Sequence, residues 1–243
     1  FCFLFVFCLC FLFFVCFLFA FLTDLAVRGN VAAATQNQAL NAVLFLYREV
    51  LKIDLPWMDG IQRAKKPVRL PVVFTRAEVK RLLAQLDGTL WLMASLIYGS
   101  GMRLMECVRL RVKDIDFHYK QIIIRDAKGQ KDRVTMLPES LFDSLRNHLV
   151  RVRELHEQDL KAGFGRVYLP HALDRKYPNA PKGWRWQWIF PQENRWKNTK
   201  TGEEGRHHTP ETILQRAVKE AVRNAGVLKN VGCLPSVTPL PRI

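Results

Sequence analysis

The order of apolar and charged positions divides the chain into a short uncharged run and a long amphipathic remainder. Residues 1–22 are almost wholly Phe, Leu, Cys and Val and carry no charge. A run of this length is able to span a bilayer, although it lacks the Trp and Tyr residues that anchor membrane helices at the lipid surface. A pyrimidine-rich DNA tract read in frame would also encode this composition. Two interpretations therefore stay open: a membrane segment, or a low-complexity artefact of a displaced reading frame.

Beyond residue 22 the apolar positions recur at helical spacing. Thr35 and Thr75 are each followed three residues later by Gln or Glu, which is capping-box spacing and predicts two helix starts. Residues 90–97 are apolar all round, which predicts a buried helix. Amphipathic helices are also predicted over residues 138–155 and 209–226, the last opened by Thr-Pro-Glu and ended by Gly.

Two β-branched runs interrupt this helical pattern. Residues 121–125 and 133–137 are separated by polar turn residues and predict a β-hairpin. The predicted fold class is therefore mainly α with a small β-hairpin or sheet.

Aromatic residues gather between residues 161 and 200. Trp184, Trp186 and Trp188 alternate along the chain, and a period of two predicts three rings on one strand face. These rings either pack a local core, which at least one of them is expected to join, or stack on nucleic-acid bases.

Charge narrows the class of partner. The 243 residues carry a formal net charge of +15 with a pI near 9.9, and every charged residue lies after residue 22. A polyanion is the partner that such a surface favours. Of six cysteines four lie in the apolar run, so no disulfide framework is predicted. No metal-ligand spacing occurs, neither a metal nor another cofactor is predicted, and His207-His208 is interpreted as a pair of surface histidines.

The stretch over residues 98–138 carries the candidate chemistry. Two glycines precede Arg103 and permit a tight turn into a helix that begins at this guanidinium, a place that favours an anion. Glu106 lies one helical turn further on and could hold the guanidinium in one orientation. Lys128 lies in the predicted hairpin loop, where an ammonium could give a proton to a leaving oxygen. The stretch is thus either a phosphate-handling site or a solvated ion pair beside a surface lysine.

The motifs of this stretch resemble the tyrosine recombinases, and more narrowly the integron integrases. The strings are Tyr98-Gly-Ser-Gly-Met-Arg103-Leu-Met-Glu106-Cys, Asp114-Ile-Asp116-Phe117 and Lys128-Gly-Gln-Lys-Asp-Arg133, and the resemblance covers about residues 23–230. It implies a tyrosine-recombinase catalytic domain over residues 72–230, preceded by part of an all-α core-binding domain over residues 23–58. The Pro- and Gly-containing basic stretch 59–71 is interpreted as the linker, and residues 231–243 as a tail outside the family pattern.

The resemblance implies metal-free phosphoryl transfer, in which a tyrosine attacks a DNA phosphodiester and two arginines and a histidine stabilise the charge. Arg103 matches the first arginine, Glu106 its orienting carboxylate and Lys128 the lysine that protonates the leaving 5′ oxygen. The implied partners are double-stranded recombination sites and folded single-stranded hairpins, whose extrahelical bases the insertion at about residues 161–200 would recognise. The candidate DNA-binding residues are Arg48, Lys52, Arg63, Lys65, Lys66, Arg69, Lys131, Arg133, Trp184, Trp186, Trp188 and Arg206.

Part of the family pattern is not found in these residues. The resemblance places a His-x-x-Arg block and a nucleophilic tyrosine after the insertion, but the last tyrosine is Tyr177 and no His-x-x-Arg string occurs after Arg151. One DNA string that encodes residues 233–243, with a single A restored just after the Cys233 codon, encodes Cys-His-Thr-Leu-Arg-His-Ser-Phe-Ala-Thr-His. We therefore hypothesise a one-base deletion at this codon, which nucleotide sequencing there would test.

Three functions remain open. The chain is a frame-disrupted integron integrase, a DNA-binding remnant without catalysis, or a membrane-anchored basic protein if residues 1–22 are a real segment. The first two place it on DNA in a bacterial cytoplasm, and the first implies self-association on DNA once the C-terminal pattern is restored.

Overall fold

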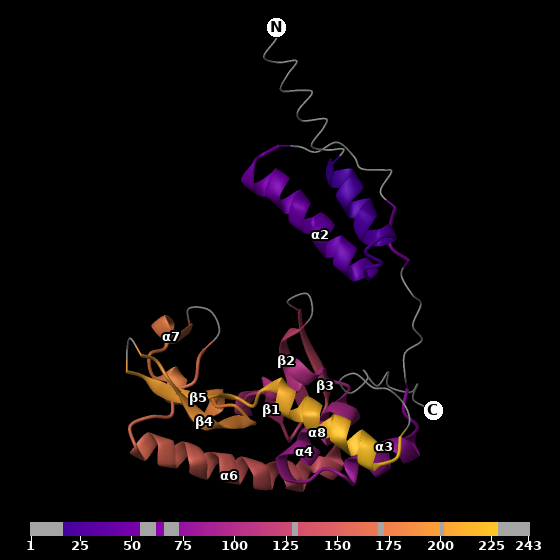
Figure 1. The fold of residues 1–243 in the computed structure, drawn as a ribbon. Coiled ribbons are helices and arrows are strands. Elements are labelled where there is room, and N and C mark those ends of the chain that lie inside the picture. The colour runs from indigo at the N-terminus through magenta and orange to yellow at the C-terminus, as the bar shows by residue number, and fades with distance from the viewer. Residues whose placement is uncertain are drawn as a thin grey trace, which may run out of the picture. The chain divides into compact units, whose positions relative to one another are not determined.

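The structure is a computed structural model that describes residues 17–53, 62–65, 73–127, 131–169, 173–199 and 202–227. The side chains of residues 126, 127, 131 and 174 are not described. The chain forms two compact units, Phe1–Leu70 and Pro71–Ile243 (Figure 1). Within the described ranges, no helix combines the length and the apolar character needed to cross a membrane. Most of the apolar run, residues 1–16, and the predicted tail 231–243 lie outside the described residues.

The first unit consists of a helix over residues 17–27 and α2 (Ala33–Phe45), which continues into the π-helical turn η1 (Leu46–Val50). The capping box predicted at Thr35 is wrong, because α2 already begins at Ala33 and its N-cap, Ala32, makes no side-chain bond. Alanine is the best helix former, so the three alanines before Thr35 extend the helix towards the N-terminus.

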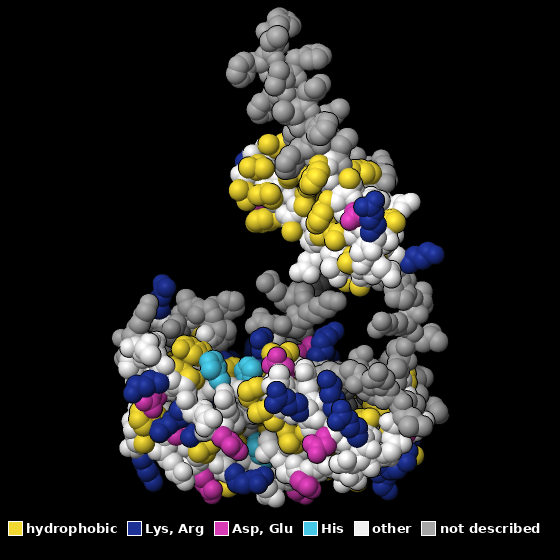
Figure 2. Space-filling model, in the orientation of Figure 1, with side chains coloured by type: hydrophobic (Ala, Val, Ile, Leu, Met, Phe, Trp, Pro, Cys, Tyr) yellow, Lys and Arg dark blue, Asp and Glu magenta, His cyan; other side chains and the backbone are white. Residues whose placement is uncertain are grey.

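The buried side chain of Gln36 joins separate segments of this unit. The Gln36 Nε2 donates to the main-chain oxygens of Leu22 at 2.8 Å and Gln62 at 2.7 Å, and its Oε1 accepts from the Ala64 N–H at 2.8 Å. Apolar side chains are nevertheless exposed across the unit, and Figure 2 shows them as its yellow surface. They are Phe17, Phe21, Val27, Phe45, Leu46, Val50 and Leu51.

The core of the second unit is built by α3 (Arg76–Leu83), α4 (Gly88–Ser100), α5 (Leu104–Val108) and α8 (Glu211–Asn224). The capping box predicted at Thr75 is confirmed, since the Glu78 N–H donates to Thr75 Oγ1 at 3.3 Å and the Glu78 carboxylate accepts from the Thr75 N–H at 2.7 Å. The predicted buried helix is also confirmed, because residues 92–97 of α4 are all buried. In α8 the buried stripe is Leu214, Val218, Ala221 and Val222.

The predicted hairpin is confirmed and belongs to a three-stranded antiparallel sheet in the order β1 (Ile115–Asp116), β2 (Gln121–Ala127), β3 (Lys131–Met136). Ile122 and Ile124 alternate on one face of β2 and are buried in the core. After the turn η3 (Glu139–Leu141), α6 (Phe142–Lys161) runs along the lower side of this unit in Figure 1. The fold is thus mainly helical with small antiparallel sheets.

The three tryptophans do not share a strand face, so that prediction is wrong. Trp184 and Trp186 lie in the 3₁₀ turn η5 (Trp184–Trp186), and Trp188 forms an isolated bridge with Arg111. The buried side chain of Gln187 explains the turn, because its Nε2 donates to main-chain oxygens from residues 165 and 181 and holds the chain inward. Trp188 is buried, as expected for at least one of the three.

The rest of the insertion comprises a short helix, a 3₁₀ turn and the first strand of a two-stranded antiparallel sheet, whose second strand follows the insertion. These elements are α7 (Leu173–Lys176), η4 (Ala180–Lys182), β4 (Pro191–Lys197) and β5 (Glu204–His208).

Candidate nucleic-acid interface

The turn into α5 uses one of the two predicted glycines. Gly101 has a φ of 67° and ends α4 in the left-handed conformation, and Arg103 then becomes the N-cap residue of α5. Gly99 lies inside α4 instead. A Cβ at this position would be 2.5 Å from Cγ of Pro138, so Gly99 allows the helix to pack against the segment that follows β3.

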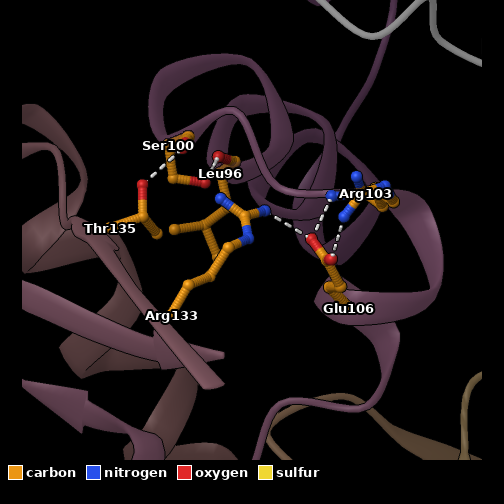
Figure 3. Close-up of polar contacts among 6 residues, drawn as sticks. All are labelled: Leu96, Ser100, Arg103, Glu106, Arg133 and Thr135. Atoms are coloured by element: carbon orange, nitrogen blue, oxygen red, sulfur yellow. Dashed lines mark hydrogen bonds and ion pairs between the residues drawn. The ribbon is translucent and has the colours of Figure 1, made fainter. Parts of the chain in front are cut away.

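Glu106 holds two guanidinium groups (Figure 3). Its carboxylate accepts hydrogen bonds from the Arg103 N–H at 2.7 Å, from Nη1 of Arg103 at 2.7 Å and from Nη2 of Arg133 at 2.6 Å. We call these three residues the Glu106 cluster. The ion pair predicted between Arg103 and Glu106 is therefore present, and β3 adds a second arginine to it.

The Glu106 cluster is buried on its acidic side and open on its basic side. The Glu106 side chain is only 9 % exposed, whereas that of Arg103 is 57 % exposed. Although burial acts to raise it, the hydrogen bonds from Arg103 and Arg133 hold the pKa of Glu106 below its usual value. One buried negative charge thus fixes two positive ones, and the cluster presents net positive charge to solvent.

Short bonds also fix the base of the hairpin beside the cluster (Figure 3). Thr135 Oγ1 donates to the main-chain oxygen of Ser100 at 2.6 Å, and Ser100 Oγ donates to that of Leu96 at 2.6 Å. The hairpin strand that carries Arg133 is thereby joined to the end of α4. Lys128 lies outside the described residues, so its predicted position near Arg103 stays a prediction.

A cavity of about 350 Å³ opens next to the Glu106 cluster. Its walls come from the segment after Arg103, from β2, from the insertion and from β5, and we call it the aromatic pocket. The residues that line it are Met105, Glu106, Arg109, Leu110, Arg111, Lys113, Asp114, Ile123, Ile124, Arg125, Tyr168, Leu169, Trp186, Trp188, His207 and His208. This volume lies at the lower end of the range for small-molecule pockets.

Cations lie against the aromatic rings of this pocket. The Arg111 guanidinium carbon is 3.8 Å from the ring centroid of Trp188, and Nζ of Lys113 is 3.2 Å from that of Trp186. Burial lowers the pKa of Arg111 to about 10, against the attraction of Asp114. Burial also lowers the pKa of Lys113 to about 8, and the nearby charge of Arg125 acts in the same direction.

Tyr168 and His207, which line the pocket, also belong to a cluster of three stacked or tilted rings that includes Trp196. Tyr168 stacks on Trp196 with centroids 4.5 Å apart and on His207 with centroids 5.3 Å apart. Burial and the neighbouring His208 lower the pKa of His207, so its ring is neutral at pH 7. His207 is exposed as predicted, but His208 is half-buried with its ring against Trp188, which corrects the interpretation of both as surface residues.

The remaining predicted DNA-binding residues are spread over both units. In the first unit Arg48, Lys52, Arg63 and Lys65 are exposed. Lys66 and Arg69 lie outside the described residues, and of Lys131 only the backbone in β3 is described. In the insertion, Trp186 and Trp188 line the aromatic pocket, whereas the ring of Trp184 lies 6.0 Å from that of His156.

Arg206 is a correction, because it does not belong to the exposed basic surface. Its side chain is 14 % exposed, and its Nε and Nη2 bind the two carboxylate oxygens of Asp159 at 2.5 Å and 3.0 Å. Its Nη1 donates to the main-chain oxygens of residues 192 and 193. Arg206 therefore joins α6 to β4 and β5 as part of the structure.

Sequence reasoning missed Arg111, Lys113 and Tyr168 as pocket residues. Nη1 of Arg111 donates to the main-chain oxygen of Trp186, 75 residues away, and Nη2 to that of Tyr168, 57 residues away. Residues close to Arg111 in the sequence do not indicate contacts at such separations. The two cations Arg111 and Lys113, placed shortly after the helix that carries Glu106, are the sequence feature that could have indicated a binding site here.

Comparison with known proteins identifies the family. Residues 73–231 match the Phage integrase family, and residues 18–57 match the Phage integrase N-terminal SAM-like domain. The chain therefore belongs to the phage integrase family of site-specific tyrosine recombinases.

Individual relatives agree with this family. An integrase/recombinase of Escherichia coli is 48 % identical over 210 residues, which are 86 % of this chain and 62 % of the relative. The tyrosine recombinase XerD of Agrobacterium fabrum is 29 % identical over 225 residues, 86 % of this chain and 60 % of the relative. The chain thus spans about three fifths of the length of these curated relatives.

A solved structure shares the fold. It is the XerH site-specific recombinase bound to palindromic difH substrate in a post-cleavage complex, with a TM-score of 0.57 and 17 % identity. The match covers 92 % of this chain and 58 % of XerH.

Proposed function

We propose that this chain is the DNA-holding part of a site-specific recombinase of the integron integrase type, in which the Glu106 cluster grips a phosphodiester of the recombination site. The observation that carries this proposal is the pair of guanidinium groups fixed by one buried carboxylate, with the Arg103 side chain left more than half exposed. A guanidinium fork matches the geometry of phosphate oxygens, and a fork that is already oriented loses less entropy on binding.

The charge of the whole chain supports DNA as the partner. A net charge of +15 draws a polyanion, and each phosphate that a basic residue neutralises releases condensed counterions. Arg48, Lys52, Arg63 and Lys65 are exposed in the first unit and would follow the phosphate backbone outside the cluster.

The aromatic pocket supports the integron type. The family resemblance assigns recognition of extrahelical bases to the insertion, and the insertion provides Tyr168 and Trp186 at the walls of this pocket. Stacking on such rings is worth about 1–3 kcal/mol per base. We propose that an unpaired base enters the aromatic pocket while Lys113 balances the charge of a neighbouring phosphate.

The chemical step follows from the resemblance. A tyrosine oxygen attacks phosphorus, a 3′-phosphotyrosyl bond forms, and the 5′ oxygen leaves with a proton that we assign to Lys128. In this scheme Arg103 and Arg133 contact the non-bridging oxygens. Within the 243 residues no tyrosine follows Tyr177 and no His-x-x-Arg string follows Arg151, so we propose that the 243-residue polypeptide by itself binds DNA without cleaving it.

The test uses the 243-residue polypeptide and two labelled DNA hairpins, one fully paired and one with a single extrahelical base. We expect fluorescence anisotropy to show affinities that fall steeply between about 50 and 200 mM salt, with tighter binding to the hairpin that has the extrahelical base. An affinity that does not change with salt concentration would refute binding to phosphates, and equal affinity for both hairpins would refute the integron type. On a denaturing gel we expect no covalent adduct, and an adduct would refute the non-cleaving part of the proposal.

A further inference from the structure

The segment from Arg103 to Asp114 carries two acids, and each of them holds one strand of the β2–β3 hairpin. Glu106 binds Arg133 of β3 at 2.6 Å, and Asp114 binds Nε of Arg125 of β2 at 2.9 Å. The first acid also belongs to the Glu106 cluster. The role of the second acid is not explained by phosphate gripping.

Asp114 uses its two carboxylate oxygens on two different parts of the fold. Oδ2 accepts the main-chain N–H of Arg111 at 3.1 Å, and Oδ1 accepts Nε of Arg125 at 2.9 Å. The Asp114 N–H in turn donates to the main-chain oxygen of Arg111 at 2.9 Å, which closes the 3₁₀ turn η2 (Val112–Asp114). Only 4 % of Asp114 is exposed, so these charged bonds form where water screens them little.

Arg111 connects this turn to the aromatic pocket. Its guanidinium donates at 2.6 Å to the main-chain oxygen of Trp186 and at 2.8 Å to that of Tyr168, and the side chains of both residues line the pocket. Arg111 itself is 7 % exposed. A ligand that orders the rings of Trp186 and Tyr168 would therefore also order Arg111.

The connection continues across the hairpin beyond Arg125. Nη1 of Arg125 lies 3.6 Å from Oδ2 of Asp132, which belongs to β3. A series of contacts thus runs from the pocket wall through the buried residues Arg111 and Asp114 to the exposed pair of Arg125 and Asp132, and so reaches both strands of the hairpin.

We propose that Asp114 is a positioning residue that couples the aromatic pocket to the β2–β3 hairpin, so that a nucleobase held in the pocket steadies the hairpin against DNA. This inference rests on the proposed function, because it takes an unpaired base as the occupant of the pocket. It assigns to Asp114 and Arg125, which both line the pocket, a role in passing the effect of base binding on to the hairpin.

Hydrogen–deuterium exchange of the hairpin amides in the 243-residue polypeptide tests this coupling. Exchange over residues 121–127 and 131–136 is compared with no DNA, with the fully paired hairpin, and with the hairpin that has one extrahelical base. We expect the extrahelical base to slow exchange by about 5-fold or more beyond the fully paired hairpin, the lower end of common coupling energies.

Two variants and a control locate the coupling. Asp114→Asn keeps an oxygen for the Arg111 N–H but removes the charge that holds Arg125, and Arg125→Gln removes the other partner at a side chain that is 46 % exposed. Both should abolish the extra protection that the extrahelical base gives to the hairpin amides. The control Arg153→Gln removes the same positive charge as Arg125→Gln, but from a surface pair with Glu157 on α6. It should retain the extra protection.

The outcomes separate this inference from the proposed function. Extra protection that survives in both variants overturns the coupling. Salt-dependent binding of both hairpins without extra protection in the unchanged chain also overturns it, while the gripping of phosphate stands. Failure of the unchanged chain to bind either hairpin overturns the proposed function and this inference with it. If Asp114→Asn does not fold, Arg125→Gln decides the question.

Discussion

Replacing Glu106 by glutamine removes the charge at the centre of the cluster and keeps its shape. The carboxylate accepts three hydrogen bonds, two of them from guanidinium groups, and bonds between charged partners contribute about 1.5–3 kcal/mol each. The glutamine oxygen can keep one or two of these bonds. The glutamine NH₂ group is itself a donor, so it cannot accept a bond from an arginine N–H. Because the arginines are partly exposed and water replaces some of the loss, we expect Glu106→Gln to lower the free energy of unfolding by about 1–3 kcal/mol.

The same change should weaken DNA binding. Without its charged partner the Arg103 guanidinium is no longer held in one orientation, and ordering a side chain costs about 0.5–1.5 kcal/mol on binding. We therefore expect affinity for the hairpin with an extrahelical base to fall by about 2- to 12-fold. Urea unfolding followed by tryptophan fluorescence measures the first effect, and anisotropy measures the second.

A matched control and a pH series make this test specific. Glu157→Gln removes an exposed acid that pairs with Arg153 at 3.1 Å, and it should change stability by less than about 0.5 kcal/mol. Since the pKa of Glu106 is lowered in the folded state, its contribution is present above the unfolded pKa of about 4.3 and is lost as pH falls through the folded value. The stability difference between the unchanged chain and Glu106→Gln should therefore shrink below about pH 4. A variant indistinguishable from Glu157→Gln in both assays refutes the reasoning.

Two further substitutions test the neighbouring residues. Because burial lowers the pKa of Lys113 to about 8, DNA affinity should fall as pH rises from about 7 to 9, and anisotropy should show no such step in Lys113→Met. Arg206→Met leaves the carboxylate of Asp159 buried without its partner, so thermal denaturation should show a loss of about 3–5 kcal/mol. The salt dependence of DNA binding should stay unchanged in Arg206→Met, and a reduced salt dependence would restore Arg206 to the DNA-binding surface.

Features set by neighbours in the sequence could be predicted. The Thr75 capping box, the buried helix over residues 92–97 and the alternation of Ile122 and Ile124 each depend on residues within one turn or one strand. The bond between Arg103 and Glu106 is of the same kind, since three residues along the chain separate its partners.

Features set by distant contacts could not be predicted. Arginine is usually a surface residue, and Arg206 pairs with Asp159 because the fold brings β5 next to α6. The alternating tryptophans have the spacing of a strand, but the bonds of Gln187 to residues 165 and 181 turn that segment instead. The aromatic pocket depends in the same way on Arg111, whose partners lie 57 and 75 residues away.

The most direct measurement of the central claim is the affinity of Arg103→Ala for hairpin DNA across a salt series, beside Arg153→Ala as a control of equal charge. If Arg103 binds a phosphate, the slope of log affinity against log salt concentration should be shallower in Arg103→Ala than in the unchanged chain. The difference should be about 0.7–0.9, the contribution of one phosphate contact. Folding should be preserved, because Glu106 retains Arg133 as its partner. An Arg103→Ala protein that is folded and binds hairpin DNA with the affinity and salt slope of the Arg153→Ala control would contradict the account.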